Sequence, residues 1–419
     1  MREMKDSGIE WVGKVPATWK IMPNKYIMTK KKVIKEVYDR ENIISLSMNG
    51  VIIRDLEAGG KMPKTFDGYQ IVYPGNLLMC LFDYDVTPRC IGLIKDYGVT
   101  SPAYSQFVMN NGNYSGYYYY YYLMIDHTKA LLHLAKNLRH SLTEEQLGAI
   151  LAPVPTIEEQ QRIVDFLDFK CSKIDATAED IQKEITLLED YKKSLVYNVI
   201  SNGINHSIYS TESDEVWGNL PQGWKLVDIK YLFEIVKRIA GKEGYDVLSV
   251  TQKGLKIKDI TSGDGQLADN YCGYQFVYPT DYVMNHMDLL TGWVDCSELF
   301  GVTSPDYRVF RLIDKSAHNL VYYKYVMQCC YMNKIFYSLG QGVSNLGRWR
   351  LQTSSFNNFK IPVPPKDEQD EIADYLDTKC SEIDSLIADK KRQLDILADY
   401  KKSLIYEYVT SKKEVPVNE

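Results

Sequence analysis

A stretch of 49 residues occurs twice in this chain, and the two copies constrain the fold more than any other feature of the sequence. The first copy spans residues 153–201 and the second spans 362–410, at a constant offset of 209 residues without a gap. Of the 49 aligned pairs, 23 are identical. A repeat of this length indicates an internal duplication, so we expect two copies of one structural unit.

Apolar residues in both copies recur in a 4-3 heptad pattern, which is typical of helices that pair lengthwise. We therefore predict two helices of about 44 residues, each roughly 66 Å long. Thr156 and Glu159 have capping-box spacing at the first helix start. Because a long helix with an apolar seam needs a partner, each copy is expected to pack against the other. The predicted seam consists of Leu167, Cys171, Ile174, Ile181, Ile185, Leu188, Leu195, Leu376, Cys380, Ile383, Ile387, Leu394, Leu397 and Leu404.

The duplication also includes the segments that precede the two helices. A Trp-Pro-Trp-Lys pattern opens both segments, and two further short motifs recur in the same order, at 68–74 and 273–279 and at 98–102 and 301–305. We expect a mixed α/β protein in which two globular α/β domains are joined by two long antiparallel coiled-coil helices, as a pseudo-twofold internal repeat. The predicted boundaries are 1–152 and 204–361 for the globular domains, 153–203 and 362–410 for the helices, and 411–419 for a C-terminal tail.

Residues 43–55 and 246–259 each have the pattern of a β-hairpin, around Asn49-Gly50 and Lys253-Gly254. Their positions in the repeat correspond, but their side chains differ. The sequence thus keeps a framework and changes the surface that it presents, which is expected of paired readers of different targets.

The net charge of −6 at first argues against a nucleic-acid-binding protein. However, residues 157–200 carry −4 and residues 366–410 carry −5, so the rest of the chain sums to +3. The acidity lies on the helices, and DNA binding by the globular segments remains possible on charge grounds. Eight Cys without a CxxC pair argue against a zinc site. The sequence has neither a long apolar run nor a signal peptide, which predicts a soluble cytoplasmic protein.

Basic residues of the globular segments are candidates for phosphate contacts, because Lys and Arg neutralise the DNA backbone. A solvated surface is the competing interpretation for many of them. The six consecutive tyrosines at 117–122 could stack on bases, but an amphipathic helix whose tyrosine faces are partly core is the favoured interpretation. The candidate DNA-binding residues are Lys30, Lys31, Lys32, Arg54, Lys61, Lys64, Arg89, Arg139, Lys253, Lys256, Lys258, Arg348 and Arg350.

The sequence contains none of the catalytic motifs that we sought. GxxxxGK[ST], HExxH, GxSxG and the Asn/Asp-Pro-Pro-aromatic motif of amino-methyltransferases are all absent. Asp168 and Asp377 each begin a D-x-K triplet resembling half of a nuclease motif, and we interpret both as charges at exposed helix positions. We therefore expect no catalytic residue, metal site or cofactor in this chain.

The order of these features resembles the specificity subunit of type I restriction–modification systems. A domain is followed by a proline-containing segment with Glu-Gln, then by a long helix ending in Asp-Tyr-Lys-Lys-Ser-Leu, and the whole arrangement is repeated. Both halves also open with a Trp-Pro-Trp pattern and have an arginine before the helix, Arg139 or Arg348. The matching residues are Pro153, Pro155, Glu159, Gln160, Asp190 to Leu195, Pro362, Pro364, Glu368, Gln369 and Asp399 to Leu404.

This resemblance implies a non-catalytic subunit that reads a bipartite, asymmetric target in double-stranded DNA, one half with each globular domain. It further implies that the helices space the domains and dock two modification subunits, which methylate adenine with S-adenosylmethionine, and that restriction subunits using ATP and Mg²⁺ join the complex. Such systems serve bacterial defence. An alternative is a duplicated coiled-coil scaffold whose globular ends bind proteins. Sequence-specific retention of duplex DNA by the complex with its methyltransferase would distinguish the two.

Overall fold

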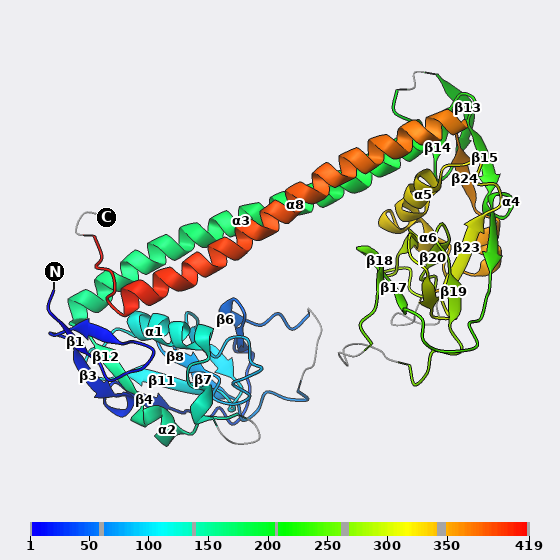
Figure 1. Ribbon diagram of the computed structural model, residues 1–419. Coiled ribbons are helices and arrows are strands. Elements are labelled where there is room, and N and C mark those ends of the chain that lie inside the picture. The colour runs from blue at the N-terminus through cyan, green and yellow to red at the C-terminus, as the bar shows by residue number, and fades with distance from the viewer. Residues whose placement is uncertain are drawn as a thin grey trace. The chain divides into compact units, whose positions relative to one another are not determined.

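The computed structural model of the chain describes residues 2–57, 63–135, 140–205, 208–260, 268–341 and 349–416. The chain divides into two compact units. Unit 1 consists of Met1–Ile181 and Arg392–Glu419, and unit 2 consists of Gln182–Lys391. Both boundaries fall within long helices, so each unit contains one globular part and a segment of each long helix (Figure 1).

The globular part of unit 1 is built on a four-stranded antiparallel sheet in the order β4-β11-β8-β9. Four antiparallel strand pairs surround it, namely β1-β2, β3-β12, β5-β6 and β7-β10. Helix α1 (Ser115–Thr128) packs against β9. The strands are β1 (Met4–Asp6), β2 (Lys14–Pro16), β3 (Lys20–Pro23), β4 (Met28–Lys31), β5 (Ile44–Ser47), β6 (Gly50–Ile53), β7 (Gln70–Val72), β8 (Leu77–Met79), β9 (Ile91–Leu93), β10 (Gly98–Thr100), β11 (Ser105–Met109) and β12 (Leu151–Val154), with short helices η1 (Asn24–Tyr26), η2 (Leu132–Leu134) and α2 (Glu144–Ala149).

Unit 2 repeats this topology strand for strand. Its central sheet has the order β16-β23-β20-β21, and its strand pairs are β13-β14, β15-β24, β17-β18 and β19-β22. Helix α5 (Leu320–Met332) takes the place of α1. The other elements are β13 (Tyr209–Asp214), β14 (Gly218–Pro221), β15 (Lys225–Asp228), α4 (Ile229–Leu232), β16 (Phe233–Val236), β17 (Leu248–Thr251), β18 (Gly254–Ile257), β19 (Gln275–Val277), β20 (Tyr282–Met284), β21 (Val294–Cys296), β22 (Gly301–Thr303), β23 (Arg308–Leu312), α6 (Ile335–Ser338), α7 (Thr353–Asn357) and β24 (Lys360–Val363). The chain is therefore mixed α/β, and both predicted hairpins are present.

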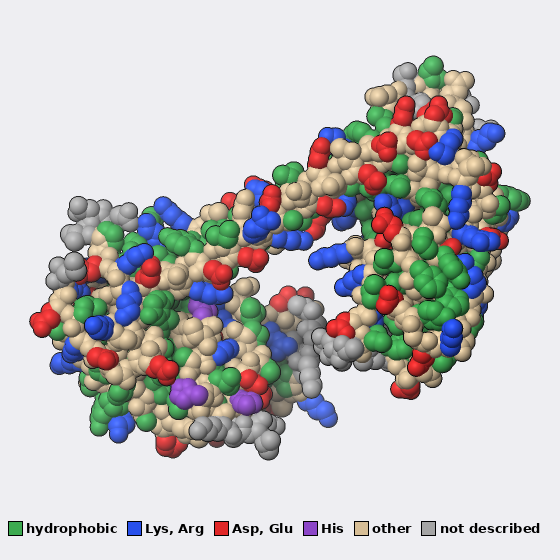
Figure 2. Space-filling model, in the orientation of Figure 1, with side chains coloured by type: hydrophobic (Ala, Val, Ile, Leu, Met, Phe, Trp, Pro, Cys, Tyr) green, Lys and Arg blue, Asp and Glu red, His purple; other side chains and the backbone are tan. Residues whose placement is uncertain are grey.

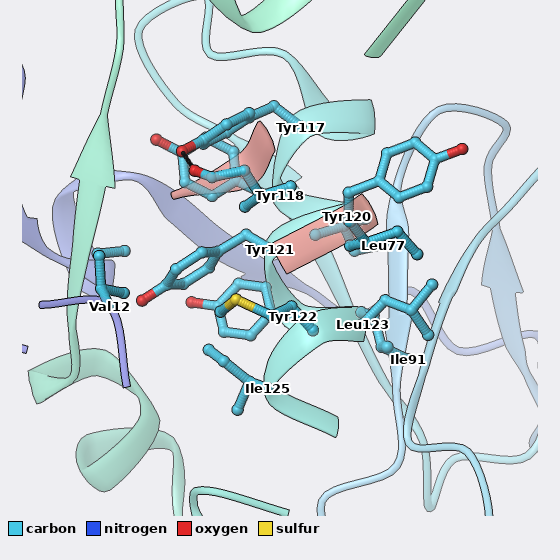
Figure 3. Packing of buried hydrophobic residues seen from close by; sticks show 14 of the residues in the cluster. Val12, Leu77, Ile91, Tyr117, Tyr118, Tyr120, Tyr121, Tyr122, Leu123 and Ile125 are labelled. Atoms are coloured by element: carbon cyan, nitrogen blue, oxygen red, sulfur yellow. Dashed lines mark hydrogen bonds between the residues drawn. The ribbon is translucent and has the colours of Figure 1, made fainter. Parts of the chain in front are cut away.

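The run of tyrosines forms the centre of the unit 1 core, as Figure 3 shows. Tyr117, Tyr118 and Tyr121 are fully buried, and of the six rings only Tyr119 is partly exposed. The helix is buried on nearly every side, which is the pattern of a central helix rather than of an amphipathic surface helix. The core position of these tyrosines is confirmed, but the amphipathic helix predicted for them is wrong, because α1 is surrounded by the fold. Their burial argues against stacking on bases.

The two long helices are α3 (Ile157–Asn202), with 46 residues, and α8 (Lys366–Val409), with 44 residues. Within each unit their segments lie side by side and run in opposite directions (Figure 1). In unit 1 the rings of Phe166 and Tyr408 are 4.4 Å apart and Lys401 Nζ is 2.6 Å from Asp175. In unit 2 Lys192 Nζ is 2.6 Å from Asp384. Because Asp384 and Lys401 lie 209 residues after Asp175 and Lys192, these ion pairs are repeat equivalents.

Most of the predicted seam residues are buried between the paired helix segments. Lys192 and Lys401, which have heptad positions in the sequence, form ion pairs at the seam edge instead of packing in it. Burial raises the pKa of the Cys171 thiol to about 11, and Cys171 and Cys380 are free thiols. The buried seam side chains are Leu167, Cys171, Ile174, Ile181, Ile185, Leu376, Cys380, Ile383, Ile387 and Leu404, and the partly buried ones are Leu188, Leu195, Leu394 and Leu397.

Among the described residues, no helix is long and apolar enough to cross a membrane. The same residues contain no group of three or more His, Cys, Asp or Glu side chains that could hold a metal ion.

Candidate nucleic-acid interface

A buried joint fixes the globular part of unit 1 on α3, and it is made by the Glu-Gln pair that the sequence repeats. Trp19 Nε1 donates to Glu159 Oε2 at 2.9 Å. Gln160 is fully buried, and its Oε1 accepts a hydrogen bond from the backbone N–H of Tyr114 at 2.8 Å. Its Nε2 donates to the carbonyl oxygen of Pro155 at 3.1 Å. The helix start is therefore bonded to two distant parts of the fold.

Unit 2 repeats the joint with the equivalent residues. Trp224 Nε1 donates to Glu368 Oε2 at 2.7 Å, and the Asn319 N–H donates to Gln369 Oε1 at 2.9 Å. Gln369 Nε2 donates to the carbonyl oxygen of Pro364 at 2.9 Å. The Trp and Glu-Gln motifs seen in the sequence are thus structural, because they attach each globular part to its helix.

The expected capping box at the start of α3 forms only in part. Thr156 Oγ1 accepts a hydrogen bond from the Glu159 N–H at 3.3 Å, as predicted. The Glu159 carboxylate is used elsewhere, since it accepts from Trp19 and forms an ion pair with Arg2. The tertiary joint has replaced the reciprocal half of the local motif.

The two D-x-K aspartates are more than exposed helix charges. Asp168 Oδ1 accepts a hydrogen bond from the Tyr120 hydroxyl at 2.6 Å, and Asp377 Oδ1 accepts from the Tyr325 hydroxyl at 2.8 Å. Both carboxylates therefore hold the core helix of their unit, α1 or α5, against a long helix. The interpretation as simple surface charges was incomplete.

Replacing Gln160 by Ala is expected to lower the free energy of unfolding by about 2 kcal/mol, because this buried side chain loses its hydrogen bonds to the Tyr114 N–H and the Pro155 carbonyl oxygen. Denaturant unfolding followed by tryptophan fluorescence measures the change. Glu158→Ala, at an exposed position two residues earlier on the same helix, is the matched control. A loss no larger than that of the control would show that the joint does not stabilise unit 1.

Hairpin β5-β6 projects from the sheet of unit 1 and exposes apolar side chains. Met48 is 65% exposed and Ile52 is 41% exposed. The opposite face of the hairpin rests on β9, where Gly92 makes room for it. A Cβ atom at Gly92 would overlap Val51 and lie 2.9 Å from Cδ1 of Leu46, so any larger residue would lift the hairpin.

The side chain of Arg89 fastens the turn of this hairpin. Its Nη1 donates to the carbonyl oxygen of Met48 at 2.8 Å, and its Nη2 donates to the Tyr119 hydroxyl at 2.6 Å. Its Nε donates to the carbonyl oxygen of Ile91 at 3.2 Å. Because all three nitrogens have internal acceptors, the structure places this candidate phosphate contact in an internal clamp.

Hairpin β17-β18 occupies the corresponding place in unit 2 and presents polar groups at its turn. Ile257 at the end of β18 is 51% exposed, as the equivalent Ile53 is 47% exposed in unit 1. Gln252, Lys253 and Lys256 are exposed. Asp295 stands where unit 1 has Gly92, and its Oδ2 accepts a hydrogen bond from the Leu255 N–H at 2.8 Å. The two hairpins thus lie on equivalent strands but contact them differently, through close packing over Gly92 in unit 1 and through a hydrogen bond to Asp295 in unit 2.

The remaining candidate basic residues do not gather at one place. Lys30 forms an ion pair with Glu144, and Lys31 Nζ lies 3.7 Å from the ring centroid of Tyr73. Arg350 Nη2 lies 2.6 Å from the sulfur of Met287. Lys32 and Lys64 are exposed. Arg54 and Lys258 are partly buried, and each follows the second strand of its hairpin. Three further candidates lie outside the described residues, namely Lys61, Arg139 and Arg348.

A groove of about 600 Å³ in unit 1 lies between the turn of β5-β6, helix α1 and the long-helix segments. Arg89, Lys95, Lys401 and Lys402 line it together with Asp168 and Asp175, and Lys401 forms an ion pair with Asp175. The groups packed around His127, which also lines it and is partly open to solvent, lower its pKa by desolvation. The sequence analysis missed Lys95 and Lys402, because nothing in the local sequence places them beside the hairpin.

An exposed aromatic cluster in unit 2 was also missed. Phe276 is stacked on Phe300, with ring centroids 5.8 Å apart, and Tyr278 lies 5.2 Å from Phe300. The guanidinium of Arg238 lies 4.7 Å from the Tyr278 ring centroid. Figure 2 shows a broad apolar area on this unit, over β19 and β23. The repeated Val-Tyr-Pro motif was its only signal in the sequence, since Tyr73 is the equivalent of Tyr278.

Comparison with known proteins agrees with this architecture. Residues 221–395 match the family model described as the type I restriction modification DNA specificity domain. The chain is 25% identical over 287 residues to the specificity subunit of type I restriction enzyme MjaVIII from Methanocaldococcus jannaschii, covering 64% of this chain and 63% of that protein. It is 24% identical over 296 residues to the putative MjaX specificity subunit of the same organism, covering 66% of this chain and 62% of that protein.

The chain thus spans less than two thirds of the length of the curated relatives it matches. A solved structure described as the structural basis of complex assembly and conformational transition of the type I R-M system shares its fold, with a TM-score of 0.67 at 13% identity. That match covers 94% of this chain and 98% of the other. The repeated domain-and-helix architecture, the family model and these relatives agree. Residues 221–395 thus match the DNA specificity domain of type I restriction–modification systems, and the chain is similar to specificity subunits of such systems.

Proposed function

We propose that this chain is the DNA-reading subunit of a type I complex, in which each globular part reads one half of a bipartite, asymmetric duplex target. The observation that carries the proposal is the pair of equivalent hairpins with unlike surfaces. Met48 and Ile52 are exposed in unit 1, whereas Gln252 and Lys253 are exposed in unit 2. Because base readout depends on a few side chains, one framework with two different surfaces fits two unlike half-sites.

The proposed domain boundaries follow the sequence: residues 1–152 and 204–361 are the target-recognition domains, and residues 153–203 and 362–410 are the spacer helices. The β3-β12 and β15-β24 pairs support domain ends close to these positions, because β12 (Leu151–Val154) and β24 (Lys360–Val363) belong to the globular parts and α3 and α8 begin at Ile157 and Lys366. In each recognition domain the last strand thus pairs with an early strand of the same domain, and the long helix follows this last strand.

The long helices would dock two copies of the same modification subunit. In unit 2 Leu187 is 68% exposed and Tyr191 57% exposed, and in unit 1 the equivalent Ile396 and Tyr400 are 61% and 53% exposed. Each pair has i, i+4 spacing and therefore lies on one face of its helix. Figure 2 shows charged side chains of both signs along the long helices. Two equivalent exposed apolar sites suit two equivalent partners.

In this proposal the partner subunits hold S-adenosylmethionine, ATP and Mg²⁺, and this chain supplies sequence selection. Restriction subunits would join the complex of this chain with its modification subunits. The scaffold alternative would use the same exposed helix faces for proteins, but it gives no role to hairpins that differ in side chains while keeping one backbone frame.

The proposal predicts different activities for the chain alone and for its complex. The full chain with its host methyltransferase subunit should enrich a split sequence from a random duplex pool and transfer methyl groups to it with S-adenosylmethionine. The full chain alone should neither cleave DNA nor transfer methyl groups. Methyl transfer by the chain alone would contradict the non-catalytic role, and a complex without sequence preference would favour the scaffold alternative.

A further inference from the structure

The turns of hairpins β5-β6 and β17-β18 share one frame. Ser47 pairs with Gly50 and Thr251 pairs with Gly254, so each turn contains two residues. Ser47 Oγ donates to the Gly50 carbonyl oxygen at 3.0 Å, and Thr251 Oγ1 donates to that of Gly254 at 2.9 Å.

The two turns share one backbone conformation, but the two residues at the centre of each turn differ. Both glycines have positive φ, +95° at Gly50 and +99° at Gly254, a conformation that other residues rarely adopt. The two residues between the frame positions are Met48-Asn49 in one unit and Gln252-Lys253 in the other, and all four are exposed. One turn therefore presents different chemistry in the two units.

Each hairpin is a two-stranded β-ribbon, an element that the major groove of DNA admits. The chemistry of the exposed residues also fits base edges. Met48 and Ile52 can contact the methyl group of thymine, whereas the Gln252 amide can bond adenine and the Lys253 ammonium can bond guanine. Neither ribbon carries an acidic residue in its turn, which would repel the phosphates.

Each ribbon is held at a set angle by a residue that the other unit lacks. In unit 1 Arg89 joins the Met48 carbonyl oxygen to the Tyr119 hydroxyl, beside Gly50. In unit 2 Asp295 binds the Leu255 N–H directly. Such fastening matters for base readout, because hydrogen bonds to bases tolerate only small displacements.

We propose that hairpins β5-β6 and β17-β18 are the ribbons that enter the major groove of the two half-sites, and that Arg89 and Asp295 are positioning residues that fix their angle. This inference rests on the proposed function and deepens it. The first half-site is expected to contain thymine under the Met48 turn. The second is expected to contain adenine or guanine under the Gln252-Lys253 turn.

The test exchanges the turn within the full chain, in complex with its methyltransferase subunit. In the double variant Met48→Gln, Asn49→Lys the frame residues Ser47 and Gly50 are kept. Selection from a random duplex pool should then return a changed first half-site, at one or two base pairs, and an unchanged second half-site. Retention of the second half-site shows that the variant complex is folded and assembled.

Variants of Arg89 and Asp295 distinguish a role in positioning the hairpins from direct contact with a DNA phosphate. Arg89→Ala and Arg89→Lys should both reduce discrimination at the first half-site by about 10- to 100-fold, the range of one good base contact. The slope of log affinity against log salt should stay at the wild-type value. A phosphate contact would instead lower that slope by about 0.9 in Arg89→Ala, while Arg89→Lys would keep it. In unit 2, Asp295→Ala should affect only the second half-site, and Asp295→Asn, which keeps an acceptor, should affect it less.

The outcomes distinguish this inference from the function on which it rests. If the turn exchange leaves both half-sites unchanged while the complex still selects a split target, the ribbons are not the readers and the proposed function stands. A lowered salt slope in Arg89→Ala overturns the positioning role. A wild-type complex that selects no sequence overturns both the function and the inference.

Discussion

A chimera in which residues 1–150 come from a relative should recognise a new first half-site while its second half-site stays unchanged. Each unit has its own sheet and its own core around α1 or α5, so replacing one globular part leaves the contacts within the other intact. Methylated positions read at single-base resolution in cells that carry the chimera provide the measurement. Because the recognised sequence is replaced, activity on the original target should fall to the background of an unrelated site.

The structure sets two conditions for this exchange. Strand β3 comes from the relative and β12 from this chain, but they pair through backbone hydrogen bonds and therefore tolerate sequence change. The relative must also carry a tryptophan at the place of Trp19, which bonds Glu159 of the retained helix. The reciprocal control replaces residues 204–361 and should change only the second half-site. A change of both half-sites in either chimera would contradict independent reading.

Lengthening α3 and α8 together by four residues should lengthen the unspecified gap between the half-sites by one or two base pairs. Four helical residues add about 6 Å, and duplex DNA advances about 3.4 Å per base pair. Four residues are also close to one turn, so the apolar seam stays near its original face. Insertions after Asp180 and after Asp395 would lie between the Lys192–Asp384 and Asp175–Lys401 ion pairs on both helices.

The single insertion after Asp180 is the matched control for the chain lengthened in both helices. It moves one of the two ion pairs about 6 Å out of register, so we expect weaker assembly than in the doubly lengthened chain. Methylation mapping against targets with gaps of increasing length gives the result. If the doubly lengthened chain still methylates only the original spacing, the helices do not set the distance between half-sites.

Periodicity and duplication in the sequence were sufficient for the long helices, the repeated domains and the two hairpins. The heptad pattern depends on local spacing alone, and the spacing of Thr156 and Glu159 indicated where α3 begins. The Asn49-Gly50 and Lys253-Gly254 pairs marked the hairpins, because a glycine with positive φ is a local requirement. Repetition also showed that the Trp and Glu-Gln motifs belong together, although not what bonds they form.

Tertiary structure alone decided the roles of individual polar side chains. Arg89 has the composition of a phosphate contact, and only the fold brings the Met48 carbonyl oxygen and the Tyr119 hydroxyl to its guanidinium. Glu159 was expected to cap its own helix but bonds Trp19, 140 residues earlier in the chain. Asp295 fastens a strand that lies 40 residues before it. A local pattern shows which groups can donate or accept, whereas the choice between a base, a phosphate and a distant backbone group depends on contacts that form only when the chain folds.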